Sequence, residues 1–228
     1  MKLASLLSGG KDSLYATFLV NQEGYDIAYI INIISENPDS YMFHVPNANL
    51  VRYQAKSMGI PLIEKTTKGE KEAELKDLED AIRKVRFRVD GIVSGAVMST
   101  YQKSRVDAIC RNFGLLSIAP LWMRNPEELL RDMLRAGFEI MITAVAAEGL
   151  TEEWLGRKLD ERCIDDLMKL NKKHGISING EGGEYETFVL DCPLFHKKIE
   201  ITDTEKIWDS RTRSGVLRIN RIEMVEKE

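Results

Sequence analysis

The sequence predicts an α/β protein: an open, doubly wound parallel sheet of five strands, followed by a smaller α+β domain. Three observations support this fold. Short apolar runs alternate with helical patterns over the first 122 residues, an order typical of parallel sheets. The run at 27–34 is nearly continuously apolar and β-branched, as in strands buried on both faces. A glycine-rich turn directly follows the first run, and such sheets bind ligands at the carboxyl ends of their strands.

The elements expected in the first domain alternate strictly between strand and helix. Strands are expected at 3–7, 27–34, 60–64, 91–94 and 115–121. Helices are expected at 14–22, 47–58, 72–89 and 99–113, and the first of these begins near Asp12 or Ser13. Gly24, Gly59 and Gly114 are placed to end three of them.

The pattern changes after Trp122, which predicts domains at 1–122 and 123–228. Asn125-Pro126 begins a helix with a cap and with proline at its first position, and Gly137 ends it. A strand at 138–146 and a helix at 161–173 follow. Further β segments at 187–190, 199–208 and 216–225 complete an α+β pattern.

Composition narrows the functional classes. The net charge of −4 argues against stable nucleic-acid binding, and the lysine pairs at 172–173 and 197–198 are interpreted as solvated surface. No apolar stretch reaches the length of a membrane span and no signal-peptide pattern is present, so a cytoplasmic protein is expected. Cys110, Cys163 and Cys192 form no CxxC pair, which argues against a zinc or dithiol site, and a role for Cys192 stays open.

The turn after the first strand has the composition of a phosphate cradle. It reads Ser8-Gly9-Gly10-Lys11-Asp12-Ser13. A turn of this kind aims main-chain N–H groups and a helix N-terminus at one small volume, which favours an anion. The glycines allow close approach of the backbone, while the lysine supplies charge and the serines supply hydroxyls.

Spacing excludes two well-known cradles. A Walker A loop needs glycine where Ser5 stands and Ser or Thr where Asp12 stands, and the dinucleotide fingerprint needs a third glycine. The remaining pattern, SGGKDS, resembles the pyrophosphate-binding loop of the PP-loop (N-type) ATP pyrophosphatases, whose sheet is HUP-like. The alternative is a glycine turn that only starts a helix.

A second cluster lies at 180–187, where three glycines alternate with three carboxylates and an aromatic ring. Taken alone, it is equally consistent with a turn before a strand. However, GEGGEYET followed by FVLDCPLF resembles the signature segment of the diphthine–ammonia ligases, a branch of the PP-loop family. Three shorter stretches agree with this resemblance: His44-Val45-Pro46-Asn47-Ala48-Asn49, Ser94-Gly95-Ala96 and Trp154-Leu155-Gly156-Arg157.

The resemblance implies an ATP-dependent amidation that uses ATP and Mg²⁺ as cofactors. The acceptor would be the carboxylate of diphthine on translation elongation factor 2. Free ammonia would complete the amide through an acyl-adenylate, releasing AMP and pyrophosphate. Asp12 would hold Mg²⁺ or fix Lys11, and these two roles stay open. A homodimer is compatible with the sequence.

The resemblance also implies roles for particular residues. The catalytic set is Lys11, Asp12, Ser13, Glu184 and Glu186. The cofactor-binding set is Ser8, Gly9, Gly10, Lys11, Asp12, Ser13, Ser35, Gly95 and Ala96. The substrate-binding set is His44, Asn47, Trp154, Gly156, Arg157, Glu181, Gly182, Gly183, Glu184, Tyr185 and Glu186.

Several roles have alternatives. Glu184 or Glu186 could bind Mg²⁺ or guide ammonia instead of substrate. His44 could be a packing residue, Trp154 a core aromatic and Asn47 a helix cap. Two other functions also remain, a transfer-RNA-modifying PP-loop enzyme and a non-catalytic nucleotide sensor. The absent cysteine pair argues against sulfur-inserting chemistry, and the intact loop argues against a sensor.

Overall fold

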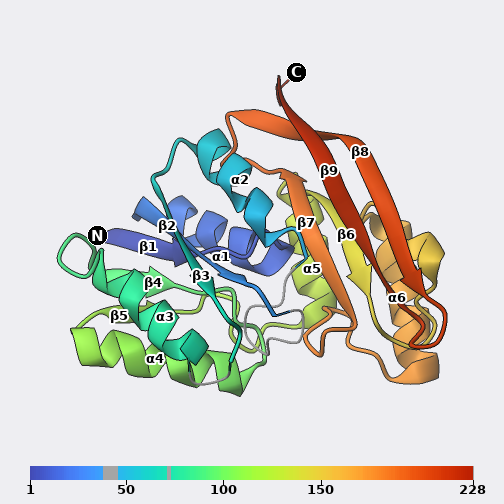
Figure 1. The fold of residues 1–228 in the computed structure, drawn as a ribbon, viewed down its shortest axis with the longest axis horizontal. Coiled ribbons are helices and arrows are strands. Elements are labelled where there is room, and N and C mark those ends of the chain that lie inside the picture. Colours follow the sequence, from blue (N-terminus) through green and yellow to red (C-terminus); the bar gives the residue numbers. More distant parts are fainter. Residues whose placement is uncertain (38–45, 71–72, 228) are drawn as a thin grey trace. The chain divides into compact units, whose positions relative to one another are not determined.

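The computed structural model describes residues 1–37, 46–70 and 73–227. The chain divides into two compact units, Met1–Met123 and Arg124–Glu228 (Figure 1). Each unit has its own sheet and its own helices. His44 lies outside the described residues.

The first unit is the expected parallel sheet. Among the described residues its strands are β1 (Lys2–Leu6), β2 (Asp26–Ser35), β3 (Leu62–Thr67), β4 (Gly91–Val93) and β5 (Leu116–Ile118). Five strands pair in the order β3-β2-β1-β4-β5, and every pairing is parallel. The chain builds outward from β1 in one direction and then in the other. The switch point of the sheet therefore lies between the carboxyl ends of β1 and β4, where α/β sheets bind ligands.

Helices cover both faces of this sheet. They are α1 (Lys11–Gln22), α2 (Val51–Met58) preceded by the 3₁₀ turn η1 (Ala48–Leu50), α3 (Ala73–Arg83) and α4 (Thr100–Phe113). One face packs Ala4, Ile31 and Ile92 against the apolar sides of α3 and α4. On the opposite face, the hydroxyls of Ser5 and Thr17 are 2.6 Å apart and join β1 to α1. Figure 1 shows α3 and α4 on one side of the sheet and α1 on the other.

Several element boundaries in the first unit differ from the sequence expectations, and α2 begins at Val51 instead of residue 47. β3 begins at Leu62 and not at residue 60, because the N–H of Ile60 closes the end of α2 by binding the carbonyl of Ala55. β5 ends at Ile118 because Pro120 follows, which has no N–H for a ladder. α3 ends at Arg83, although the apolar pattern continues through Val85.

The second unit has an antiparallel sheet. In its described part the helical elements are α5 (Pro126–Arg135), the 3₁₀ turn η2 (Glu152–Trp154) and α6 (Glu161–His174). The strands are β6 (Glu139–Val145), β7 (Tyr185–Asp191), β8 (Lys197–Asp209) and β9 (Ser214–Glu226), paired in the order β7-β6-β9-β8. The expected cap of α5 is confirmed, since the side chain of Asn125 accepts the N–H of Glu128 at 3.1 Å.

The described helices give no candidate for a membrane crossing, since none is both long enough and apolar enough.

Candidate functional site

The loop after β1 is closed by its own serines. Ser13 Oγ accepts the N–H of Ser8 at 3.2 Å and donates to the carbonyl of Gly10 at 3.1 Å. Gly9 has φ of 91°, a left-handed conformation that favours glycine. Gly10 is the N-cap residue of α1. Its backbone is extended, and it has no side chain to cap the helix. The first turn of α1 therefore meets a short, fixed loop at the switch point of the sheet.

Lys11 and Asp12 form an ion pair within this loop. Lys11 Nζ lies 2.8 Å from Asp12 Oδ2, and the lysine is only 3% exposed. Of the two roles that the sequence left open for Asp12, this contact corresponds to fixing Lys11. Lys11 therefore places a nearly buried ammonium group in the first turn of α1, where a helix N-terminus also favours anions.

The segment after β4 forms a wall behind the loop. A Cβ on Gly95 would lie 2.6 Å from the main-chain nitrogen of Ser13 and 2.7 Å from the carbonyl carbon of Asp12. Only glycine allows this approach, so Gly95 fixes where α1 begins. The neighbouring Ser94 and Ala96 are buried. This segment and the SGGKDS loop therefore lie at the same edge of the sheet.

Two further residues hold the loop, and the sequence reasoning missed both. Gln54 is fully buried on α2 and donates from Nε2 to the carbonyl of Gly9 at 3.0 Å. Thr17 donates to the carbonyl of Ser13 at 2.7 Å. The sequence feature that could have revealed Gln54 is a polar residue on the buried side of the short helix α2. Ser35 is part of a turn with Asn37 at the end of β2.

The glycine-rich loop of the second unit is organised around Glu184. Its carboxylate accepts the N–H of Ser177 at 2.8 Å and the N–H of Gly182 at 2.7 Å. Tyr185 is 2% exposed and donates its hydroxyl to the carbonyl of Ile178 at 2.7 Å. Gly182 and Gly183 form the exposed tip, with Glu181 beside them and Glu186 on β7.

The Trp154 motif lies on the other side of β6 from β7. Gly156 donates its N–H to the carbonyl of Ile142, a residue that pairs with Thr187 of β7. The guanidinium of Arg157 covers the Trp154 ring at 4.5 Å from its centroid, and Trp154 is 8% exposed. Asp166 accepts from Arg157 at 2.7 Å, and hydrogen bonds from Lys169 and Arg157 lower the pKa of its carboxyl. Strand β6 thus separates two motifs that the sequence placed in one substrate site.

Asn47 precedes η1 with φ of 66° and makes no side-chain cap. The alternative role as a helix cap, which the sequence left open, is therefore not realised. The left-handed conformation is one that asparagine tolerates better than most residues.

The cysteines offer no nucleophile. All three are buried, and burial raises the pKa of Cys192 to about 12 and that of Cys110 and Cys163 to about 11. Thiols of this kind stay protonated and unreactive at neutral pH. For Cys192 the structure therefore indicates a packing role within the signature segment.

The described residues contain no cluster of three His, Cys, Asp or Glu side chains that could hold a metal.

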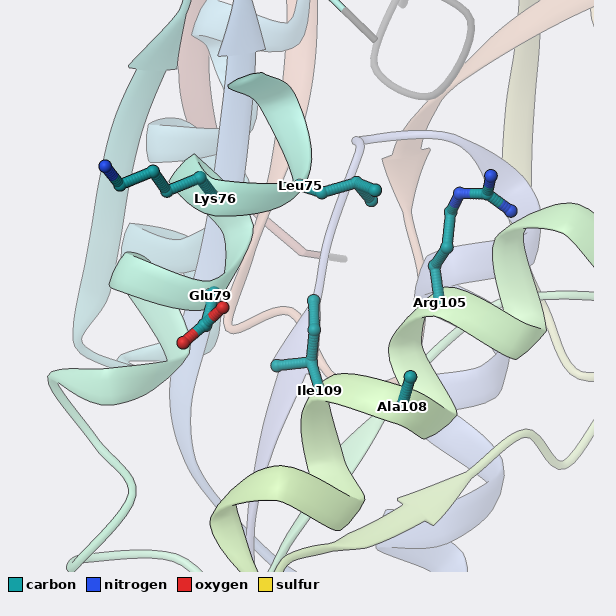
Figure 2. A pocket seen from close by; sticks show the side chains of 6 residues that line it. All are labelled: Leu75, Lys76, Glu79, Arg105, Ala108 and Ile109. Carbon is teal, nitrogen blue, oxygen red and sulfur yellow. The ribbon is translucent and has the colours of Figure 1, made fainter. Parts of the chain in front are cut away.

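A cavity of about 310 Å³ lies between α3 and α4, lined by Leu75, Lys76, Glu79, Arg105, Ala108 and Ile109 (Figure 2). Figure 2 shows Leu75 and Ile109 pointing into the space, whereas Lys76 points away from it. Glu79 pairs with Arg83, and the guanidinium of Arg105 lies over the Tyr101 ring. The predicted site residues are not among those lining it.

Known proteins resemble this chain along its whole length. Residues 1–117 match the family model for the diphthamide synthase N-terminal domain, and residues 125–225 match that for the C-terminal domain. Proteins named diphthine–ammonia ligase are similar in sequence. The one from Mus musculus is 35% identical over 100% of this chain and 94% of its own length. The one from Homo sapiens is 37% identical, with coverage of 91% and 85%. The one from Danio rerio is 36% identical, with coverage of 100% and 98%.

The parallel sheet, its switch point and the closed SGGKDS loop define a doubly wound α/β protein with a candidate anion-binding loop. With both family models matched in order along the sequence, the chain belongs to the diphthamide synthase family.

Proposed function

We propose that this protein is a diphthine–ammonia ligase. It would amidate diphthine on translation elongation factor 2 with ammonia, through an acyl-adenylate, to give diphthamide, AMP and pyrophosphate. The observation that carries the proposal is the similarity to proteins of that name, which spans 91–100% of this chain and so includes both units. The closed, lysine-bearing loop supplies the anion site that such a reaction needs.

The first unit would bind ATP, whose reactive part is the α-phosphorus. The main-chain N–H groups at the start of α1 would face the phosphates, and Lys11 would stabilise the negative charge of the departing pyrophosphate. Mg²⁺ commonly needs only one or two protein carboxylates beside phosphates and water. Asp12 fits that requirement, so it would hold the ion at the edge where Lys11 now pairs with it.

The second unit would bind the modified histidine. Its fixed trimethylammonium group cannot donate a hydrogen bond, so carboxylates and aromatic faces must recognise it. Glu181 and Glu186 would contribute charge, and Glu184 would shape the loop between them, as its hydrogen bonds to the main chain suggest. Arg157 already covers one face of Trp154, so this ring would act mainly by packing behind the site.

Ammonia would be taken directly from solution. A glutaminase activity needs a nucleophile, and the three buried thiols with raised pKa values do not provide one. Glutamine should therefore fail to replace ammonium with the purified protein alone.

The test is a defined reaction with diphthine-bearing elongation factor 2, ATP and ammonium. Mass spectrometry of the modified peptide should show replacement of the carboxylate by an amide, with AMP and pyrophosphate formed in step. Lys11→Ala should lower the rate by about 10²-fold or more, the loss typical of one preorganised group. ADP as the main product, or amide formation without ATP, would contradict the proposal.

A further inference from the structure

An exposed cluster of cations and aromatic rings lies at the end of α3. Four of the six residues at 83–88 are basic, in the order Arg-Lys-Val-Arg-Phe-Arg. Phe87 is 86% exposed, which is unusual for so large an apolar side chain. We call this cluster, with Phe113 from the end of α4, the arginine–phenylalanine patch. It concentrates positive charge on a protein whose net charge is −4.

The patch is built from stacked planar groups. The guanidinium of Arg86 lies 4.4 Å from the centroid of the Phe87 ring and 5.5 Å from that of Phe113. Arg83 lies 5.7 Å from the Phe113 centroid. These cation–π contacts place the arginine side chains over the rings. Phe87 nevertheless keeps most of its surface in solvent.

The patch lies at the edge of the sheet opposite to the phosphate loop. α3 ends and β4 begins there, at the amino ends of the parallel strands, whereas Lys11 follows the carboxyl end of β1. A partner bound at the patch would therefore leave the loop accessible.

We propose that the arginine–phenylalanine patch binds single-stranded RNA. Closely spaced arginines suit phosphates, to which guanidinium groups can donate two parallel hydrogen bonds. An exposed ring among cations is the arrangement by which proteins stack bases of single strands. A cluster of carboxylates would satisfy the cations but not the exposed ring, whereas a single strand offers both phosphates and bases. The contact is local and sensitive to salt, which agrees with an overall charge that does not favour tight nucleic-acid binding.

The experiment measures anisotropy of a labelled oligouridylate over a salt titration, with inorganic polyphosphate and polyglutamate as competitors. Phe87→Ala should weaken oligouridylate binding by about five-fold or more, the lower range for loss of one stacked base. It should leave the affinity for polyphosphate, which has no bases, unchanged. The double variant Lys84→Gln/Arg88→Gln should make the slope of log K against log salt shallower by about 1.4. This is the change expected when two phosphate contacts to a single strand are lost.

Lys172→Gln/Lys173→Gln is the matched control, because it removes the same charge from an exposed pair on α6 of the other unit. This control should bind oligouridylate like the parent protein. The proposal is overturned if oligouridylate does not bind at low salt, or if the control and patch variants behave alike. Unchanged binding by Phe87→Ala, or tighter binding of polyglutamate, would instead indicate a general anion contact or an acidic protein partner. A change in sedimentation of Phe87→Ala would indicate a second copy of the chain.

Discussion

At the scale of single residues, two contacts decide the shape of both loops. Glu184 uses both carboxylate oxygens to bind main-chain N–H groups of its own loop. Gly95 lies against the main chain where α1 begins. Neither residue needs to touch a ligand to matter, since each fixes the backbone that would.

The first prediction concerns Glu184→Gln. The amide can accept only one of the two N–H groups, so the loop loses a charge-assisted hydrogen bond, a cost of about 1–3 kcal/mol. We expect a raised KM for the elongation-factor substrate and an unchanged affinity for ATP, each measured separately. Glu223→Gln, an exposed carboxylate on β9, is the control. If the variant binds ATP–Mg²⁺ more weakly while its affinity for the elongation-factor substrate is unchanged, Glu184 binds the metal ion and does not shape the substrate site.

The second prediction concerns Gly95→Ala. Its new Cβ would meet main-chain atoms of Ser13 and Asp12 at 2.6–2.7 Å, so the start of α1 must move. ATP affinity, measured by calorimetry, should fall by about ten-fold, the effect of a 1.4 kcal/mol change in binding free energy. Gly91→Ala crowds the carbonyl of Leu116 at 2.9 Å at the far end of β4, and it should lower stability while the folded protein keeps its ATP affinity. Equal ATP affinity in both variants would contradict this account of Gly95.

At the scale of elements, Trp154, Arg157 and α6 act as one packed unit. The ring is buried, one face lies under a guanidinium, and that guanidinium is held by Asp166 on α6. Arg157, which follows η2 in the chain, therefore links the Trp154 ring of η2 to Asp166 of α6.

The third prediction follows from this packing. Trp154→Ala should destabilise the protein by about 3–5 kcal/mol, the usual cost of removing a buried tryptophan. Trp154→Phe retains a ring under Arg157 and should lose much less. Thermal unfolding measures both. A Trp154→Ala protein with unchanged stability and impaired use of diphthine would show that the ring binds substrate directly.

Sequence periodicity predicts elements well where burial alone decides them and less well where hydrogen bonds end them. The strands β1, β2 and β4 were predicted because their apolar runs are largely buried, whereas β3 and β5 were recognised by their place in the alternation of strands and helices. The end of α3 was not predicted. Val85 lies in a turn after the helix but is only 1% exposed, so the apolar spacing of the helix continues past its end. The loop motifs were visible as glycines and charges. The contacts of Gly95, Gln54 and Glu184 were not, since each depends on chain segments brought together by folding or by a turn.

At the scale of the whole molecule, both units bury cysteine thiols. Cys110 lies in the first unit, and Cys163 and Cys192 lie in the second. Their raised pKa values mean that the folded chain holds these protons more tightly than the unfolded chain does. This part of the stability is complete below about pH 9, the ordinary thiol pKa, and is lost as the pH rises toward about 12.

The fourth prediction is a fall in the urea midpoint as the pH rises above about 9, since the unfolded thiols have an ordinary pKa of 9.0. A variant with all three cysteines replaced by alanine should lose less stability over the same range. At pH values below 9 a disulfide reagent should label the native protein slowly and the unfolded protein at once. Rapid labelling of the native chain would show that a thiol is accessible.

The central position of β1 governs the order in which the chain can fold. Leu3 pairs with Ile27 on one side but with Gly91 on the other, and Gly95 must arrive before the start of α1 is fixed. During synthesis the SGGKDS loop is made before β4 and Gly95, which form its wall. Until β4 is in place, β1 has an open edge, and open edges can template aggregation. The loop therefore reaches its native form only after β4 and Gly95 have been made, and an arrested chain that ends before β4 would carry SGGKDS without the contact that fixes the start of α1.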